Sequence, residues 1–155
     1  KMNMYVYFAS KLFEEYNKHI KKEVIENVYG MFDGCTWFVQ MMMNELFALT
    51  ADGGFCDIDK LELAINDIIM IQENSYKDML ANLAHKQKIV LQAIAKERIA
   101  KNITSSSFIK KYNLPSASSV QSAVKPLIKN DIVTQEGDAY RVYDYFFAEW
   151  LAKEY

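Results

Sequence analysis

The chain has 155 residues, of which 51% are hydrophobic and 14% aromatic, so it can bury a real core and is not intrinsically disordered. Its 5 glycines and 2 prolines are too few for a fold with many tight turns, which disfavours β-sandwiches and barrels. No apolar run approaches the roughly 18 residues of a membrane helix, and the first residues do not resemble a signal peptide. We therefore expect no membrane partner. Because the first residue is not Met, we expect a piece of a longer protein.

The two cysteines, Cys35 and Cys56, stand outside any Cys/His cluster, so we expect no metal site. Two lone thiols suit a reducing cytoplasm, although a disulfide between them stays open at this stage. The net charge of −2 is unevenly distributed along the chain. Residues 86–130 carry nine basic and one acidic side chain, whereas the segments on either side are acidic. Such a concentrated basic segment is typical of a nucleic-acid contact.

In the first half, apolar residues recur at helical spacing and indicate a helical bundle over residues 1–83. Gly34 follows Asp33 and predicts a helix stop with positive φ. Asp59 and Glu62 resemble a capping box that opens the fourth helix. The predicted helices are residues 3–18, 22–32, 36–49, 59–72 and a short one over 75–83.

The second half, residues 84–155, has a different pattern of predicted elements, with a hairpin as well as helices. The predicted helices are residues 85–101, 106–112, 117–130 and 144–153, with a hairpin whose strands cover 132–134 and 139–142. Ser116 is the expected N-cap of the third of these helices, and Pro126 predicts a kink and an early end. Helix, short helix, turn, helix and hairpin is the order of a winged helix-turn-helix. The expected fold is mainly α: a helical bundle, then a winged helix with a small hairpin wing.

In such a motif the second helix enters the major groove of DNA. Serine hydroxyls and glutamine amides can form hydrogen bonds with bases, and lysines contact phosphates. The candidate contacts are Lys101, Lys110, Lys111, Ser116, Ser118, Ser119, Gln121, Ser122, Lys125, Lys129 and Arg141. The alternative is a solvated face, because the helix lacks arginine and the wing tip, Glu136-Gly137-Asp138, is acidic.

Four strings carry a resemblance to a known family. Gly34-Cys35-Thr36-Trp37-Phe38-Val39-Gln40 resembles the lid motif G-x-P-aromatic-aromatic-x-Q of archaeal-type P-loop ATPases, in the STAND branch of the AAA+ class. Residues 83–96, 114–133 and 140–151 also resemble that family, in the same order. The resemblance implies a helical lid followed by a winged helix. It places Gly34 and Thr36 against the nucleotide, with Thr36 where the family has proline. The residues alone favour the plainer interpretation, in which Gly34 is a helix stop and Thr36 an N-cap.

The catalytic machinery of that family is absent from this sequence. A P-loop needs G-x-x-x-x-G-K-[ST], and none of the glycines is followed by lysine. We therefore expect no catalysis by this chain and no cofactor within it, whereas the resemblance implies ATP and Mg²⁺ for the full-length protein. The expected function is a regulatory fragment whose lid senses nucleotide held by a missing N-terminal P-loop domain. The winged helix would then contact another protein. The alternative is a DNA-binding module that contacts duplex DNA through residues 101–129.

Overall fold

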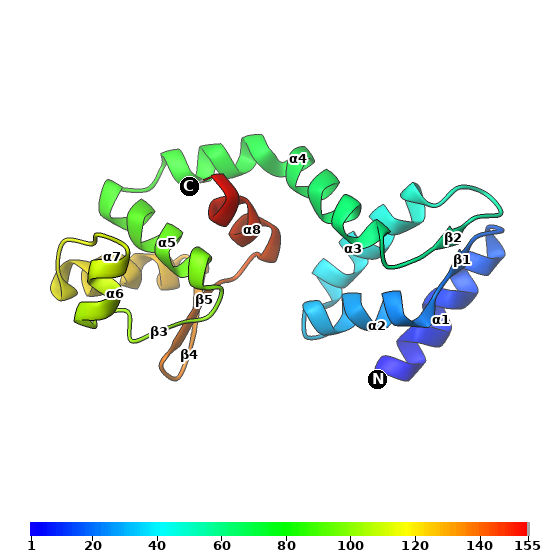
Figure 1. The fold of residues 1–155 in the computed structure, drawn as a ribbon, viewed down its shortest axis with the longest axis horizontal. Coiled ribbons are helices and arrows are strands. Elements are labelled where there is room, and N and C mark those ends of the chain that lie inside the picture. Colours follow the sequence, from blue (N-terminus) through cyan, green and yellow to red (C-terminus); the bar gives the residue numbers. More distant parts are fainter. Residues whose placement is uncertain (155) are drawn as a thin grey trace. The chain divides into compact units, whose positions relative to one another are not determined.

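The computed structural model of the chain describes residues 1–154 (Figure 1). It forms two compact units, Lys1–Ile71 (unit 1) and Gln72–Tyr155 (unit 2). The division falls inside helix α4 (Lys60–Ala81), whereas the sequence places it after residue 83. Tyr155, the last residue of the predicted second domain, lies outside the described residues.

Unit 1 is built from three helices, a short parallel strand pair and the first part of α4. The elements are α1 (Met2–Glu15), β1 (His19–Ile20), α2 (Lys22–Met31), α3 (Thr36–Leu49) and β2 (Phe55–Cys56). In the strand pair His19 lies opposite Phe55 and Ile20 opposite Cys56. The sequence does not reveal these strands, because two residues are too few to show an alternating pattern. The core contains fully buried residues of α2 and α3, among them Val24, Ile25, Val28, Met42 and Leu46.

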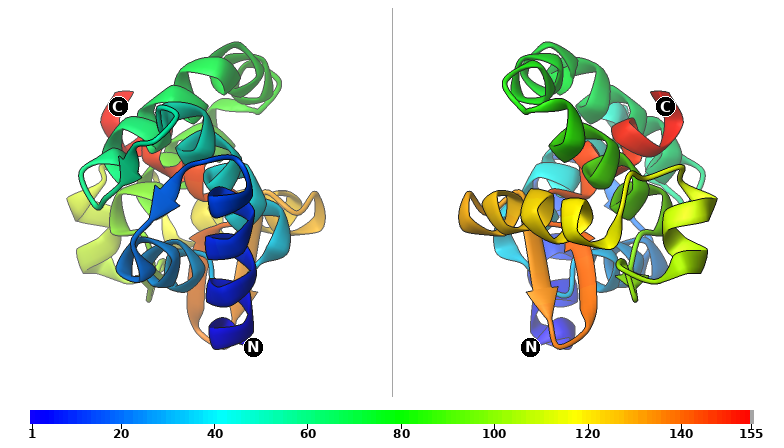
Figure 2. Two further views of the ribbon diagram at one scale, coloured as in Figure 1. Left: turned by 90° about the vertical axis from the view of Figure 1, so that its right-hand side faces the viewer. Right: turned by 90° about the vertical axis from the view of Figure 1, so that its left-hand side faces the viewer.

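Unit 2 has the winged-helix order of elements predicted from the sequence. After α4 come α5 (His85–Glu97), β3 (Ala100–Lys101), α6 (Ser106–Lys111), α7 (Ala117–Lys129), β4 (Val133–Glu136), β5 (Ala139–Val142) and α8 (Tyr145–Glu154). The three strands form an antiparallel sheet in the order β3-β5-β4. The β4–β5 hairpin is the wing, and it extends beside α7 (Figure 2). Helix α5 packs against both α7 and α8, so the core of the unit surrounds α5.

Three predicted helix boundaries are wrong. The predicted helix 3–18 ends at Glu15, and Asn17 beyond it has φ 56°. The predicted helices 59–72 and 75–83 are one continuous helix, α4, because the sequence between them contains neither proline nor glycine and the buried face continues through Tyr76 and Leu80. The predicted helix 85–101 ends at Glu97, since Arg98 has φ 63°. Ala100 and Lys101 then pair with β5 as a third strand.

The Ser116 cap predicted from the sequence is confirmed, and the structure shows further side-chain caps in unit 2. The Ser116 hydroxyl accepts a hydrogen bond from the Ser119 backbone N–H at 3.2 Å, and Ser105 caps α6 through Phe108 N–H in the same way. Asp144 accepts bonds from the N–H groups of Phe146 and Phe147 at the start of α8. Helix α7 does not end early, because it continues past Pro126 to Lys129.

The aromatic residues of α8 attach this helix to the rest of unit 2. Phe146, Phe147 and Trp150 are buried, and the ring of Tyr76 on α4 lies 5.0 Å from that of Phe147. Burial raises the pKa of the Tyr76 hydroxyl. Both cysteines of the chain are free thiols. Among the described residues, no helix combines the length and apolar character needed to cross a bilayer.

Candidate functional site

The outward face of α7 carries five of the eleven candidate contacts predicted from the sequence. Val120, Ala123, Val124 and Leu127 turn inward and are buried. The opposite side of the helix forms what we call the basic face, made of exposed Ser118, Gln121, Ser122, Lys125 and Lys129. Their spacing of three and four residues keeps them on one side of the helix. The structure therefore brings these predicted residues together.

The serine hydroxyls near the start of α7 form hydrogen bonds within the helix. The Ser116 hydroxyl donates to that of Ser119 at 3.1 Å and lies 3.2 Å from that of Ser118. The Ser122 hydroxyl donates to the backbone oxygen of Ser119 at 3.1 Å. These serines thus serve first as a cap and its extension.

Four predicted lysines are available to an anion. Lys101 on β3, Lys110 on α6, and Lys125 and Lys129 on α7 are exposed. Within residues 1–154, none of the four forms an ion pair (salt bridges of unit 2 involve other residues). Unpaired lysines on neighbouring elements suit phosphate oxygens, which accept bonds from ammonium groups.

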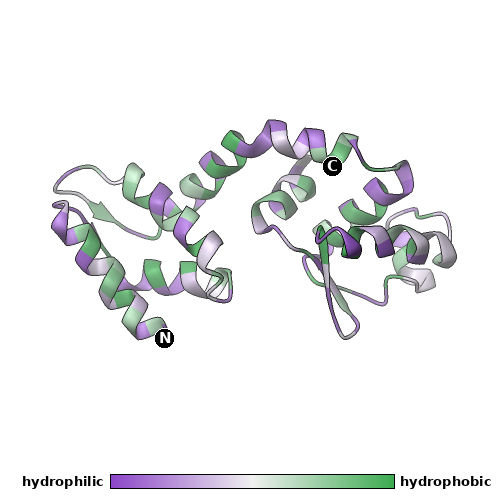
Figure 3. Cartoon of the chain, turned by 180° about the vertical axis from the view of Figure 1, so that it is seen from behind, coloured by the Kyte–Doolittle hydropathy of each residue, from purple (hydrophilic) through white to green (hydrophobic). Residues whose placement is uncertain are grey.

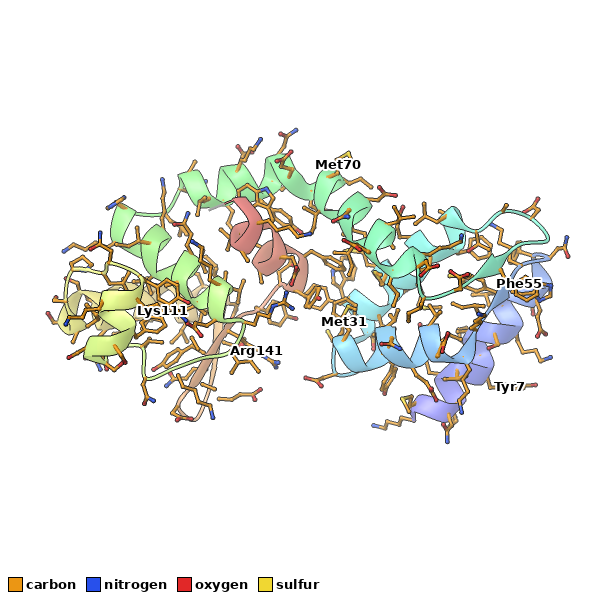
Figure 4. All side chains as sticks on the ribbon, viewed as in Figure 1. Tyr7, Met31, Phe55, Met70, Lys111 and Arg141 are labelled. Carbon is orange, nitrogen blue, oxygen red and sulfur yellow. The ribbon has the colours of Figure 1, made fainter. Side chains whose placement is uncertain are left out.

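The other two predicted cationic contacts are already engaged. Lys111 forms an ion pair with Glu97, which also accepts a hydrogen bond from the Tyr112 hydroxyl. These two donors lower the pKa of the Glu97 carboxyl. Arg141 lies 3.6 Å from the Glu136 carboxylate on the neighbouring strand of the wing. Figure 4 shows Lys111 on α6 and Arg141 on β5.

The wing turns acidic side chains outward. Gly137 has φ 61° at the turn, and Glu136 and Asp138 on either side are exposed. The Gln135 amide donates to the Tyr140 hydroxyl at 2.9 Å and to the Gly137 backbone oxygen at 3.1 Å. The wing tip therefore presents carboxylates, which repel phosphate.

The other predicted site lies in the loop between α2 and α3. Gly34 has φ 69°, which confirms the predicted helix stop with positive φ. A Cβ at Gly34 would lie 2.7 Å from the Tyr29 ring, so the glycine also allows close packing. Cys35, not Thr36, is the N-cap of α3, and its side chain makes no capping bond. Thr36 is the first residue of the helix, so the interpretation of Thr36 as an N-cap is wrong.

Gly34 and Thr36 both line an open cavity of about 1270 Å³ in unit 1, which we call the α1–α3 groove. Its wall on α1 includes Met4, Phe8 and Leu12, and Met4 is 78% exposed. The remaining lining residues are Lys1, Tyr5, Ala9, Phe13, Tyr16, Tyr29, Asp33, Val39, Gln40, Met43, Asn44 and Phe47. Figure 3 shows the hydrophobic colour recurring along α1. The groove offers apolar and aromatic surface with a single lysine, so its lining suits a base or an apolar side chain and not a phosphate.

The sequence contains a signal for this groove that the prediction does not use. Met4, Phe8 and Leu12 on α1 and Tyr16 just after it are four residues apart and form an exposed stripe, whereas Val6, Ala9 and Phe13 form the buried side of the helix. A surface helix with apolar residues on two sides has one side left over for another contact. The periodicity indicates a helix but not which apolar side is covered.

Neither unit presents a group of three or more metal-ligating side chains within the described residues. Met42 and Met43 are buried in unit 1, so these methionines fill the core. One comparison bears on the second half of the chain. A family model described as a probable winged helix domain matches residues 74–153. No curated protein matches the chain. Because the match covers more than half of the sequence and coincides with the strands and helices of unit 2, the chain belongs to the family of probable winged helix domains.

Proposed function

We propose that the chain is the regulatory C-terminal part of a STAND-type ATPase. Unit 1 acts as a lid over nucleotide held by a preceding P-loop domain, and the winged helix is the interaction module that follows the lid. The chain itself lacks a P-loop, so we expect the isolated chain not to hydrolyse ATP.

The observation that carries this proposal is the location of the loop that resembles the lid motif. Gly34 and Thr36 lie at the α1–α3 groove, where the loop can contact a ligand or a neighbouring domain. Gly34 allows the backbone to pack against Tyr29 in a conformation that other residues rarely adopt. The groove lining suits the base and the sugar, whereas the phosphates and Mg²⁺ would be held by the P-loop domain.

Substitutions at Thr36 test the lid in the full-length protein. Thr36→Lys places a long charged side chain at the groove, and we expect nucleotide affinity to fall about 5- to 10-fold, the effect of about 1 to 1.4 kcal/mol. Thr36→Pro restores the residue of the resembled family, and we expect it to retain affinity. Proline suits the first helical position, and Cys35 before it has the extended conformation that proline requires.

The matched control is Ala48→Lys, an exposed position on the same helix that does not line the groove. Titration with a fluorescent ADP analogue measures all three variants against the wild type. Equal affinity of Thr36→Lys and Ala48→Lys would contradict the lid, as would a full-length protein that binds no nucleotide.

We propose DNA binding by unit 2 as a second function, and one observation favours it. Lys101, Lys110, Lys125 and Lys129 are exposed lysines without ion-pair partners among residues 1–154. Lys110, Lys125 and Lys129 lie on the two helices of the helix-turn-helix, α6 and α7, and Lys101 lies on β3 just before them. Backbone contacts of this kind supply salt-dependent affinity without sequence preference.

Fluorescence anisotropy against a short random duplex tests this function. We expect log K to fall with log salt by about 0.9 per neutralised phosphate. The double variant Lys125→Ala/Lys129→Ala should lower that slope by about 1.8, whereas Lys21→Ala in unit 1 should leave it unchanged. No binding at low salt would contradict DNA binding and leave the lid proposal standing.

A further inference from the structure

Gln121 differs from the serines that surround it on α7. The hydroxyls of Ser116, Ser119 and Ser122 hydrogen-bond inside the helix terminus. Gln121 is exposed, and within residues 1–154 its amide has no hydrogen-bond partner. The amide therefore keeps both its donors and its acceptor for a ligand.

The position of Gln121 on the helix suits contact with a base. It lies one turn before Lys125, and Lys129 follows one turn later on the same side. The two lysines can contact phosphates while the neutral Gln121 side chain, nearer the start of the helix, reaches base edges in the major groove of DNA. Recognition helices usually divide their contacts in this way.

The chemistry of the amide selects one base. In the major groove adenine presents an acceptor at N7 beside a donor at N6, and a glutamine amide matches both atoms at once. Guanine presents two acceptors, which suit arginine, and α7 contains no arginine. We propose that Gln121 determines the base specificity of unit 2 by a bidentate contact with adenine in duplex DNA. This inference rests on the DNA binding proposed above.

Selection from a randomised duplex library tests the assignment with the whole chain. The wild type should enrich adenine at one position of the site, and Gln121→Ala should lose that preference by roughly 5- to 150-fold. Alanine is a strong helix former at this exposed position, so the variant keeps its fold. The matched control, Lys129→Ala, should bind all duplexes more weakly and enrich the same sequence as the wild type.

A chemical probe then identifies the base atom. Replacing the selected adenine by 7-deazaadenine removes N7 and keeps the Watson–Crick pair, so it should weaken the wild type and leave Gln121→Ala unaffected. Unchanged selection by Gln121→Ala, or a wild type without base preference, would overturn the role of Gln121 while DNA binding stands. Absence of any duplex binding at low salt would overturn both.

Discussion

Unit 1 and unit 2 are both mainly helical, but they differ in how much apolar surface they leave exposed and in how their helix starts are capped. Unit 2 buries the aromatic side of α8 and ties its helix starts with side-chain caps at Ser105, Ser116 and Asp144. Unit 1 leaves an apolar stripe of α1 in the open, and its caps at Lys21 and Cys35 make no side-chain bond. A winged helix closes its own core, whereas the first unit has apolar surface left for another contact.

The charges of the two units are also opposite in sign. Unit 1 has six basic and eleven acidic residues, and unit 2 has twelve basic and nine acidic residues. The open surface of unit 1 is apolar, and that of α7 in unit 2 is cationic. The two units are therefore suited to different partners, the first through apolar contact and the second through charge.

The largest expected effect is a difference in the free energy of unfolding between a variant in the core of unit 2 and one on the exposed side of α1. Phe147→Ala removes a buried ring that stacks on Trp150 in unit 2, and we expect a loss of about 3–5 kcal/mol in the free energy of unfolding. Phe8→Ala truncates the same side chain on α1, where it is 61% exposed, and should change stability by no more than about 0.5 kcal/mol. Urea unfolding followed by circular dichroism measures both. Equal losses would show that α1 is as enclosed as α8.

The next effect compares two glycines with positive φ. Gly34→Ala in unit 1 should cost about 2–3 kcal/mol, since the left-handed conformation is strained for alanine and its Cβ displaces the Tyr29 ring. Gly137→Ala in the wing has the same strain, but nothing lies within 4 Å of its Cβ, so about 1 kcal/mol is expected. Thermal unfolding ranks the pair. The opposite ranking would mean that Tyr29 moves aside without cost.

The sequence predicts unit 2 more fully than unit 1, for local reasons. Ser116 before an amphipathic run, and Gly137 between two short alternating segments, are turn and cap signals that act within a few residues. The β3 strand escapes detection because Ala100 and Lys101 follow a helix of suitable composition. Ala100 pairs with Tyr140 and Lys101 with Ala139, so the pairing depends on residues about 40 positions later in the chain.

In the candidate sites, too, local features could be predicted from the sequence and contacts between distant elements could not. Helical spacing is enough to place Ser118, Lys125 and Lys129 on one face of α7. It cannot show that Lys111 is paired with Glu97 or that Arg141 is paired with Glu136, because these contacts join separate elements. The α1–α3 groove is likewise a tertiary feature, since its walls come from helices that only the fold brings together.

Removal of a cap should produce a smaller loss. Ser116→Ala deletes the bond to Ser119 N–H in unit 2 and should cost about 1 kcal/mol. Cys35→Ala in unit 1 is the matched change, and its cost should stay below about 0.5 kcal/mol because Cys35 makes no capping bond. Urea unfolding of the two variants checks the difference. A loss at Cys35 as large as that at Ser116 would indicate that packing, and not capping, decides stability at both helix starts.

The smallest effects distinguish the units by pH. The donors Lys111 and Tyr112 lower the pKa of Glu97 in unit 2, so its stabilising contribution is complete above the unfolded pKa and is lost as pH falls through the folded pKa. In unit 1, burial and the Asp67 carboxyl raise the pKa of Glu45, so its ionised form opposes folding at neutral pH and this opposition is relieved in acid.

Neutral glutamine replacements should therefore act in opposite directions. Glu97→Gln should destabilise unit 2 at pH 7, and Glu45→Gln should stabilise unit 1, each by less than about 1 kcal/mol and each with an effect that fades in acid. Hydrogen exchange of peptides from α5 and α3 between pH 7 and pH 4 reports on each unit separately. If both variants shifted their units in the same direction, the environments of the two carboxyls would be alike. The contrast between a carboxylate that accepts bonds from Lys111 and Tyr112 and one that lies beside another acid would then be wrong.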